Sequence, residues 1–560
     1  MSEILRLKRS NCRNCYKCIR NCPVQAIRFY ENQAYIANDM CVYCGACLTA
    51  CPQNAQEYAE PTEAVSALLR GGDTVIASVS SAFAAYYGTG FDALRRSLLQ
   101  LGFTKAEETA VGAALVQKEY ARLLLEGEQD VIITSACHTV NLLIRKYYPE
   151  LVHCLAPVVT PMEAHKKHLC AADPQAKIVF IGPCLSAKDE AIAGAADEAL
   201  TFEELDCMLA GAGISVVADE WDSDGTQAGL FAVAGGILRG VEHCNESYTY
   251  LAVDGMEKCR AVLDEMKSGN IHRCFVEMSA CEGGCVGGPF MKEYAGTPVS
   301  HYQAITRRAG KAEIDSVSLP VEQMYREHTP IPVELHEPGE EDICAVLRRM
   351  GKTSPAKELN CGHCGYNTCR EMAAAVCRGK ADVNMCQPYM MEKSAHFTTT
   401  LLDNTPNGIL ILNEDYEIQR INRAAMKMLH IDFESDALEQ PVMNIMDPIP
   451  FMEVMQNKIP VVGRRDYYAE YGIYLEQTIV HDAPSQLLLA FLRDVTAEES
   501  DRQYHERLLE QTAETADKVV DKQMRIVQEI ASLLGEAAAE TKIALTKLKE
   551  SMSHEHEHDK

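Results

Sequence analysis

The stretch from Glu277 to Gly288 contains two cysteines, Cys281 and Cys285, four positions apart and surrounded by small residues. Glycine lets a backbone approach a bulky group that a side chain would collide with, and thiolate is a ligand that iron binds well. The stretch therefore predicts an inorganic group held by two thiolates. A tight turn with a spare cysteine is the alternative that this stretch alone leaves open.

Cysteine is abundant, with 24 in 560 residues, and the first 60 residues contain two copies of one cysteine pattern. The copies are Cys12-x-x-Cys15-x-x-Cys18-x-x-x-Cys22-Pro23 and Cys41-x-x-Cys44-x-x-Cys47-x-x-x-Cys51-Pro52. This spacing is that of two-cluster bacterial ferredoxins, in which the fourth cysteine of each run binds the other cluster. One 4Fe–4S cluster is expected on Cys12, Cys15, Cys18 and Cys51, and a second on Cys41, Cys44, Cys47 and Cys22. Two such clusters can carry electrons to a site further along the chain.

A third group of cysteines has the spacing C-x-x-C-x4-C-x16-C and comprises Cys361, Cys364, Cys369 and Cys386. It resembles the small 4Fe–4S domain of several iron–sulfur and corrinoid proteins, and one further 4Fe–4S cluster is expected there. A zinc ion is the alternative. Cys377 is interpreted as a packing residue and His363 as a loop residue.

Charge and composition exclude several classes of function. The net charge of −27 argues against a nucleic-acid partner, which would need a basic face, and against a general role at a membrane surface. The sequence contains no apolar run of about 18 residues and opens without a signal peptide, so a cytoplasmic protein is expected. In a reducing compartment, clustered thiols indicate metal binding rather than disulfides.

Apolar runs alternating with amphipathic segments must position the remaining cysteines. Residues 74–79, 130–135 and 177–182 read as buried parallel strands, and residues 91–101 and 110–125 as helices between them. Ligands gather at the carboxyl ends of strands in such α/β domains. Cys137 and Cys184 each follow one of these strands, so they are expected to join Cys281 and Cys285 at one site.

The three segments around these four cysteines resemble the H-cluster motifs of FeFe-hydrogenases, and the resemblance covers about residues 1–330. It implies that Cys137, Cys184, Cys281 and Cys285 hold a 4Fe–4S cluster. Cys285 would also bridge to a two-iron unit with CO, cyanide and a dithiolate bridge, and nearby glycines would suit this close packing.

Several positions depart from the catalytic members of that family. Where a cysteine relays protons in those members, this chain has Ala136, and a methyl group cannot carry a proton. The candidates for the remaining catalytic roles are Cys285, Glu119, His138 and Lys188. Lys188 lies one residue later than the lysine that contacts a cyanide in the family, whose position is Ala187. The next acidic residue of the family's relay, after the one that corresponds to Glu119, is replaced here by Leu123. Two methionines that pack the two-iron unit in catalytic members are replaced by Gly182 and Ser279.

The cysteine pattern ends before the last third of the chain. Residues 401–425 and 487–496 resemble the beginning and the final strand of a PAS domain, with Asn422 as a helix cap. The PAS ligand is not identified: His430 and His481 could bind haem, with surface roles as the alternative. Beyond Ala497 a polar helix is expected, with a heptad seam over about four heptads that would pair with a second helix. The seam is formed by Val520, Met524, Val527, Ala531, Leu534, Ala538, Thr541, Leu545 and Leu548.

A multidomain fold follows from these segments. It comprises an α+β two-cluster bacterial ferredoxin domain (1–60), an α/β FeFe-hydrogenase H-cluster domain (61–335), a small 4Fe–4S domain (336–396), an α+β PAS domain (397–497), a C-terminal coiled-coil helix (498–550) and a disordered tail (551–560).

The leading functional hypothesis is a sensory member of the FeFe-hydrogenase family. It would bind H2 at the H-cluster, turn over slowly, exchange electrons with a transfer partner and act as a homodimer on a signalling partner in trans, such as a kinase or phosphatase. The alternatives are a fully active hydrogenase that exchanges electrons with a ferredoxin-type partner, and a non-catalytic iron–sulfur scaffold.

Overall fold

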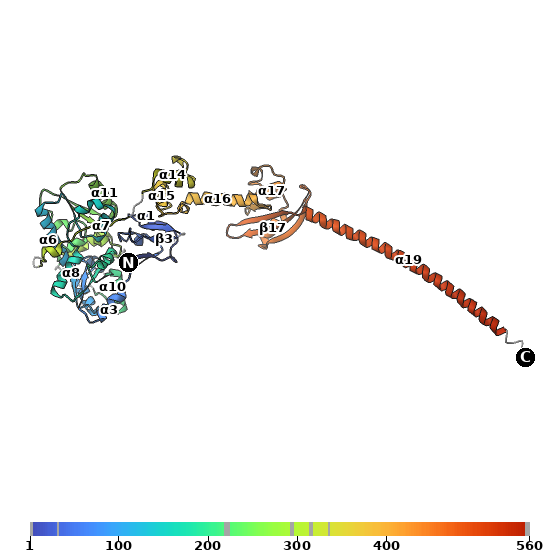
Figure 1. The fold of residues 1–560 in the computed structure, drawn as a ribbon, viewed down its shortest axis with the longest axis horizontal. Helices are drawn as coiled ribbons and strands as arrows, with labels where there is room; N and C mark the ends of the chain where they lie inside the picture. The colour runs from blue at the N-terminus through green and yellow to red at the C-terminus, as the bar shows by residue number, and fades with distance from the viewer. Residues whose placement is uncertain are drawn as a thin grey trace. The chain divides into compact units, whose positions relative to one another are not determined.

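The computed structural model describes residues 4–30, 33–217, 225–291, 296–312, 317–333 and 337–554. The chain divides into two compact units, Met1–Met390 and Met391–Lys560 (Figure 1). Within the described ranges, no helix combines the length and the apolar character needed to cross a membrane.

The first 60 residues form two small antiparallel pairs, β1 (Leu5–Leu7) with β4 (Gln56–Tyr58) and β2 (Ile27–Tyr30) with β3 (Gln33–Ile36). The short helices α1 (Lys17–Arg20) and α2 (Ala46–Ala50) lie within the cysteine runs. This is the arrangement expected for a ferredoxin-type segment.

The two cysteine loops repeat one backbone signature. Left-handed backbone occurs at corresponding positions of the loops, with φ of 53°, 58° and 49° at Asn14, Tyr16 and Gln25, and of 52°, 77° and 46° at Tyr43, Gly45 and Asn54. The loops differ in what they contact. A Cβ atom on Gly45 would lie 2.6 Å from Cγ of Pro289, whereas the ring of Tyr16 packs edge-on against Phe29.

The hydrogenase-like region contains two parallel sheets rather than one. The first has the strand order β6 (Lys105–Glu108), β5 (Val75–Val79), β8 (Lys177–Gly182), β9 (Glu198–Thr201), and the second has the order β11 (Thr249–Asp254), β12 (Cys274–Ser279), β7 (Val131–Ile133). The three strands predicted from the sequence are β5, β7 and β8. Every residue of β5 is buried, which explains its continuous run of apolar and small residues.

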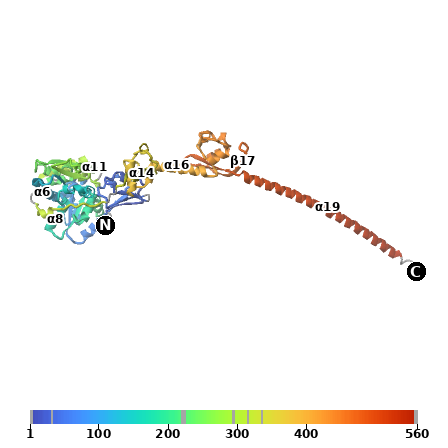
Figure 2. The same ribbon diagram turned by 45° about the horizontal axis from the view of Figure 1, so that its top comes forward.

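Helices connect these strands and cover the sheets (Figure 2). The predicted helices correspond to α5 (Phe91–Leu101) and α6 (Ala110–Glu126), and α8 (Pro161–Ala172) packs against α6. α7 (His138–Tyr147), α9 (Ser186–Ile192), α10 (Phe202–Gly211), α11 (Met256–Lys267) and α12 (Pro298–Arg308) complete the main helices of this region.

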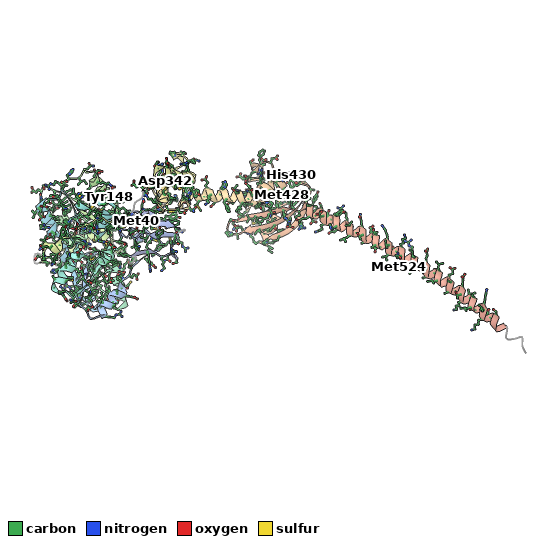
Figure 3. The ribbon with its side chains drawn as sticks, in the orientation of Figure 1. Met40, Tyr148, Asp342, Met428, His430 and Met524 are labelled. Carbon is green, nitrogen blue, oxygen red and sulfur yellow. The ribbon has the colours of Figure 1, made fainter. Side chains whose placement is uncertain are left out.

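One hydrophobic core joins the ferredoxin-type segment to the hydrogenase-like region. Met40 and Tyr148, both labelled in Figure 3, belong to this core. The Lys146 ammonium donates to the carbonyl oxygen of Cys41 at 2.7 Å, and the Tyr147 hydroxyl donates to that of Met40 at 2.7 Å. The second cysteine loop is therefore fixed against α7.

Residues 340–386 form a third part of this first unit, with α14 (Glu340–Arg349) packed on α15 (Cys369–Cys377). The Phe29 N–H donates to the carbonyl oxygen of Lys380 at 2.8 Å. A Cβ atom on Gly365 would lie 3.1 Å from Ile19 and 3.5 Å from Tyr16. The segment therefore abuts the first cysteine loop of the ferredoxin-type segment.

The second unit contains a five-stranded antiparallel sheet in the order β15 (Ile418–Ile421), β14 (Gly408–Leu412), β18 (Leu487–Asp494), β17 (Ile473–Asp482), β16 (Val461–Tyr468). Helix α17 (Arg423–Met428) begins at Asn422, whose side chain accepts the N–H of Ala425, so the predicted cap is present. Helix α18 (Ile449–Asn457) packs on the same sheet.

Two long helices flank this sheet in the sequence. α16 (Gln387–Asn404) precedes it, and α19 (Thr496–His554) follows it as a helix of 59 residues. All nine residues of the predicted seam are exposed, including Met524, which is labelled in Figure 3. The helix extends to His554, into the segment predicted as a tail, and residues 555–560 lie outside the described residues.

Candidate iron–sulfur and hydrogen-binding site

The four cysteines predicted to form the central site meet at one cavity of about 140 Å³. Cys137, Cys184, Cys281 and Cys285 all line it. Cys137 follows β7, Cys184 follows β8 and Cys281 follows β12, so the carboxyl ends of strands from both sheets converge on this cavity. The structure thus brings together thiols that are up to 148 positions apart in the chain (137 to 285).

Glycines allow the loop that contains Cys281 and Cys285 to fold against its neighbours. Gly284 has a φ of +87°, and a Cβ atom there would lie 2.7 Å from the backbone nitrogen of Ala234. The Gly283 N–H donates to Asp254 at 2.7 Å, and the N–H of Ala234 donates to the carbonyl oxygen of Gly283 at 3.0 Å. The loop is therefore fixed at several points, and only glycine fits at position 284 without strain.

The environment of the four thiols favours their neutral form in the absence of metal. Burial raises the pKa of Cys137 to about 11, and the charge of the neighbouring Cys184 adds to this effect. Burial likewise raises the pKa of Cys184, Cys281 and Cys285. Because iron binds thiolate, loading this site must release protons.

The rest of the cavity wall is mostly apolar. Ala136, Ala187 and Ser279, three of the positions at which the sequence departs from the catalytic members of the family it resembles, line it. Met162 and Met278 also line it, and the sequence pattern did not reveal them. Two methionines therefore reach the cavity from positions other than those expected from the family.

Polar and acidic groups also line the cavity. His138 is buried and lines the cavity, and its Nε2 lies 2.7 Å from Asp189. Glu190 also lines the cavity, is 5% exposed and accepts a hydrogen bond from the Thr160 hydroxyl. Burial raises the pKa of Glu190 above its usual value. Thr160 and Glu190 were not assigned a role from the sequence, although Glu190 stands in the second cysteine segment.

Glu119 and Lys188 lie outside the set of residues that line the cavity. The Glu119 carboxylate accepts from Arg122 at 2.9 Å, and the Lys188 ammonium lies 2.8 Å from both carboxylate oxygens of Glu204. On α6 it is Tyr120, the residue after Glu119, that points toward the first cysteine segment. Its hydroxyl accepts the N–H of Ser135 at 2.9 Å.

Each of the other three cysteine sets lines a cavity of its own. The lining sets are Cys12, Cys15, Cys18 and Cys51; Cys22, Cys41, Cys44 and Cys47; and Cys361, Cys364, Cys369 and Cys386. In the first two sets, the fourth cysteine comes from the other run, as the ferredoxin spacing predicts. Cys44 also lines the central cavity, so one residue borders two of the four sites.

The two PAS histidines make local contacts. The ring of His430, labelled in Figure 3, lies edge-on to Tyr471 at 5.8 Å between centroids. His481 Nε2 lies 3.2 Å from the Lys458 ammonium. Neither histidine belongs to the lining of the 260 Å³ cavity found in this unit.

Comparisons with protein families match four segments of the chain. The model for the C-terminal domain of the iron-only hydrogenase large subunit matches residues 73–289, and a 4Fe–4S dicluster model matches residues 11–55. A model for an Fe–S cluster domain matches residues 358–388, and a PAS model matches residues 396–458.

Individual relatives match shorter segments. The ferredoxin of Alicyclobacillus acidocaldarius is 47% identical over 38 residues, which is 7% of this chain and 49% of that protein. A protein of an ion-translocating oxidoreductase complex from Methanosarcina acetivorans is 48% identical over 46 residues, which is 8% of this chain and 17% of that protein. The matched regions thus span half or less of these relatives.

Solved structures of two kinds are similar to parts of the chain. An FeFe-hydrogenase from Chlamydomonas reinhardtii aligns over 49% of this chain and 100% of its own, with 18% identity and a TM-score of 0.38. The PAS domain of an HTR-like protein from Haloarcula marismortui aligns over 19% of this chain and 97% of its own, with 18% identity and a TM-score of 0.16. From the family models and the gathered cysteines, the conclusion is that this chain is a PAS-containing, FeFe-hydrogenase-like iron–sulfur protein.

Proposed function

We propose that this protein is a hydrogen sensor that binds H2 at an H-cluster and turns it over slowly. The observation that carries the proposal is the composition of the central cavity. The four thiols that would hold the cluster line it together, while the side chain at the proton-relay position is the methyl group of Ala136. Such a site keeps the means to bind its cofactor and lacks a group that speeds proton transfer.

The donor set fits the cofactor. Cys137, Cys184, Cys281 and Cys285 would hold the 4Fe–4S part, and Cys285 would also bridge to the two-iron unit. When bound, the H-cluster supplies cleavage of H2 into two protons and two electrons. The apolar wall formed by Met162, Met278 and neighbouring residues would exclude water from it.

Electrons would leave through the ferredoxin-type segment. Cys44 borders both the central cavity and the cavity of the second cysteine set. The first set lies beside the segment 361–386, where the Arg20 guanidinium donates to the carbonyl oxygen of Gly362 at 3.4 Å. All four cluster sites could therefore form one electron path, with an external transfer partner at its end.

The segment 361–386 is proposed to hold a fourth iron–sulfur cluster rather than zinc. Its four cysteines line one cavity, as do the four cysteines of each ferredoxin-type set. Cubane clusters need thiolates spread around a larger object than one ion. Cys386 is followed directly by α16, which leads into the PAS sheet.

The output would act through the PAS domain and α19. The exposed seam of α19 is proposed to pair with a second copy of the chain, since exposed apolar side chains at heptad spacing are stabilised by such pairing. A kinase or phosphatase in trans is the proposed recipient of the signal.

Infrared spectroscopy of the matured protein, in which the two-iron unit has been installed, tests the proposal. CO and cyanide bands that change on addition of H2, with slow hydrogen uptake, are expected, and the Cys285→Ser variant should lack those bands. A matured protein without such bands would be the non-catalytic scaffold. Turnover as fast as that of a catalytic hydrogenase assayed in parallel would identify a working enzyme instead.

A further inference from the structure

A chain of buried polar side chains starts at the central cavity. The Ser78 hydroxyl lies 2.9 Å from the Thr109 hydroxyl and 2.8 Å from Nδ1 of His165. Ser78 and His165 are 1% and 0% exposed, and Thr109 is 8% exposed. Three groups that can each donate and accept a proton are thus hydrogen-bonded in series inside the protein.

The strands and helices bring these groups together. β5 pairs with β6 so that Ser78 stands opposite Glu107, and paired residues of neighbouring strands project from the same face of the sheet. His165 reaches that face from α8. Gly112 of α6 allows α8 to lie this close, because a Cβ atom at position 112 would be 2.8 Å from Cβ of His165.

The inner end of the chain is Thr109, which lines the same cavity as Cys285. The outer end is Glu107, whose side chain is 25% exposed and pairs with the Lys105 ammonium at 2.7 Å. Between them, Nε2 of His165 is buried and has no hydrogen-bond partner among the described residues. Glu107 is the first of the charges that act on the His165 ring, ahead of His168 and Lys105.

The ring of His165 is suited to pass protons rather than to store them. Burial lowers the pKa of His165 to about 4, so the imidazole is neutral at physiological pH. A neutral imidazole has one nitrogen that donates and one that accepts. The ring can therefore take a proton at one nitrogen and release another from the opposite nitrogen.

We propose that Thr109, Ser78, His165 and Glu107 form a proton route between the central cavity and solvent. This proposal rests on the proposed function, because a proton route is needed only if H2 is cleaved in the cavity. The route would carry protons slowly in a chain that has Ala136 in place of the relay cysteine.

The transfer conserves protons and leaves every group of the route with its original charge. During H2 cleavage, a proton released in the cavity binds the Thr109 oxygen, which passes its own proton to Ser78. Ser78 passes its proton to Nδ1 of His165. Because Nε2 is not hydrogen-bonded to Glu107 directly, its proton passes through a bridging water to the Glu107 carboxylate and then to solvent. Rotation of the hydroxyls and exchange of the ring tautomer restore the starting state, and proton reduction uses the same steps in reverse.

The test compares hydrogen uptake of the matured full-length protein in four forms. These are wild type, Ser78→Ala, Glu107→Gln and the control Ser97→Ala, in which a buried serine outside the route, bonded to the Ala93 carbonyl, is replaced. A loss of at least fivefold in both route variants, with Ser97→Ala within twofold of wild type, supports the route. A loss smaller than fivefold in Glu107→Gln, which is partly exposed and not expected to disturb folding, overturns it.

A second measurement is independent of cofactor loading. In unmatured protein labelled with ¹⁵N in its 17 histidine rings, two histidines, His328 and His165, should remain neutral down to about pH 5, because burial lowers the pKa of each to about 4. The signal that is absent from a His165→Gln variant is that of His165. Its ring signals should shift in Ser78→Ala and in Glu107→Gln but not in Ser97→Ala, and an unshifted signal in Glu107→Gln overturns the link to solvent. If wild type shows no response to H2, the proposed function fails instead, and the two failures are therefore distinguishable.

Discussion

Replacing Lys188 by methionine tests whether this lysine stabilises the fold or contacts the cofactor. Lys188 and Glu204 are 5% and 4% exposed, and the ammonium also donates to the carbonyl oxygen of Ala199 at 3.2 Å. In Lys188→Met, the Glu204 carboxylate keeps the N–H of Thr201 as a donor but loses its cation. The variant therefore leaves an uncompensated charge in a buried site.

The size of the effect follows from that burial. Removing one partner of a buried ion pair costs about 3–5 kcal/mol, because neither water nor a counter-ion stabilises the remaining charge. Globular proteins have an unfolding entropy of about 2.1 cal/mol/K per residue, so in a unit of the size of Met1–Met390 each kcal/mol lowers Tm by roughly 1.2 °C. A decrease in Tm of about 4–6 °C is expected from these two figures.

Calorimetry of unmatured protein with equal iron content measures this decrease. Lys267→Met is the matched control, because Lys267 and Glu150 form an ion pair with side chains 61% and 39% exposed. Water screens the charges of an exposed pair, so the Tm of Lys267→Met should stay close to that of wild type. The double variant Lys188→Met with Glu204→Gln should recover part of the loss, because no unpaired charge remains.

Infrared spectra of the matured variants can refute the structural role of Lys188. The structural role predicts cyanide bands in Lys188→Met that match those in Lys267→Met. An unchanged Tm together with shifted cyanide bands would show that Lys188 contacts the two-iron unit, and the argument from the buried ion pair would be wrong.

Three further predictions concern the cavity, pH and α19. Ala136→Cys, which adds an exchangeable proton to the cavity wall beside His138, should raise hydrogen uptake at least tenfold, a barrier change of about 1.4 kcal/mol; a smaller gain contradicts the argument from the missing relay. Burial raises the pKa of Glu277 to about 7 from a usual value of 4.5. The folded state thus favours the protonated carboxyl, and stability should fall by about 3 kcal/mol as pH rises from about 4.5 to 7. In Glu277→Gln, the pH dependence of Tm should be correspondingly flatter, and parallel curves for variant and wild type would count against this reasoning. Leu534→Asp, which places a charge in the α19 seam, should convert a dimer to monomers in light scattering while Glu529→Ala does not; a persistent dimer would show that the seam does not mediate pairing.

Local patterns in the sequence predicted much of this architecture. The strands β5, β7 and β8 and the Asn422 cap follow from periodicity and capping chemistry within short windows, whereas the hydrogenase-like and PAS parts of the fold class follow from resemblance to those families. The grouping of cysteines by ferredoxin spacing agrees with the sets that share a cavity. These features depend on neighbours in the chain, which the sequence displays directly.

Features that depend on distant segments were not visible in the sequence. The division of the parallel strands into two sheets, and the approach of Met162 to the cavity, result from tertiary packing. Glu119 and Tyr120 show that a shift of one residue in a helix changes which side chain faces the site. Successive residues of a helix point about 100° apart, so Tyr120 points toward the first cysteine segment while Glu119 pairs with Arg122. If a role of the family is assigned to a residue one position away, the side chain that is assigned differs both in its direction and in its functional group.

The repeated left-handed positions of the two cysteine loops indicate how this segment evolved. Positions 14, 16 and 25 recur at 43, 45 and 54, always 29 residues later, which is the pattern that duplication of an ancestral half would leave. The copies now face different neighbours. The ring of Pro289 leaves no room for a side chain at position 45, whereas position 16 accommodates a tyrosine beside Gly365. Selection on each half therefore follows its neighbour, and a substitution that the first loop tolerates is excluded from the second.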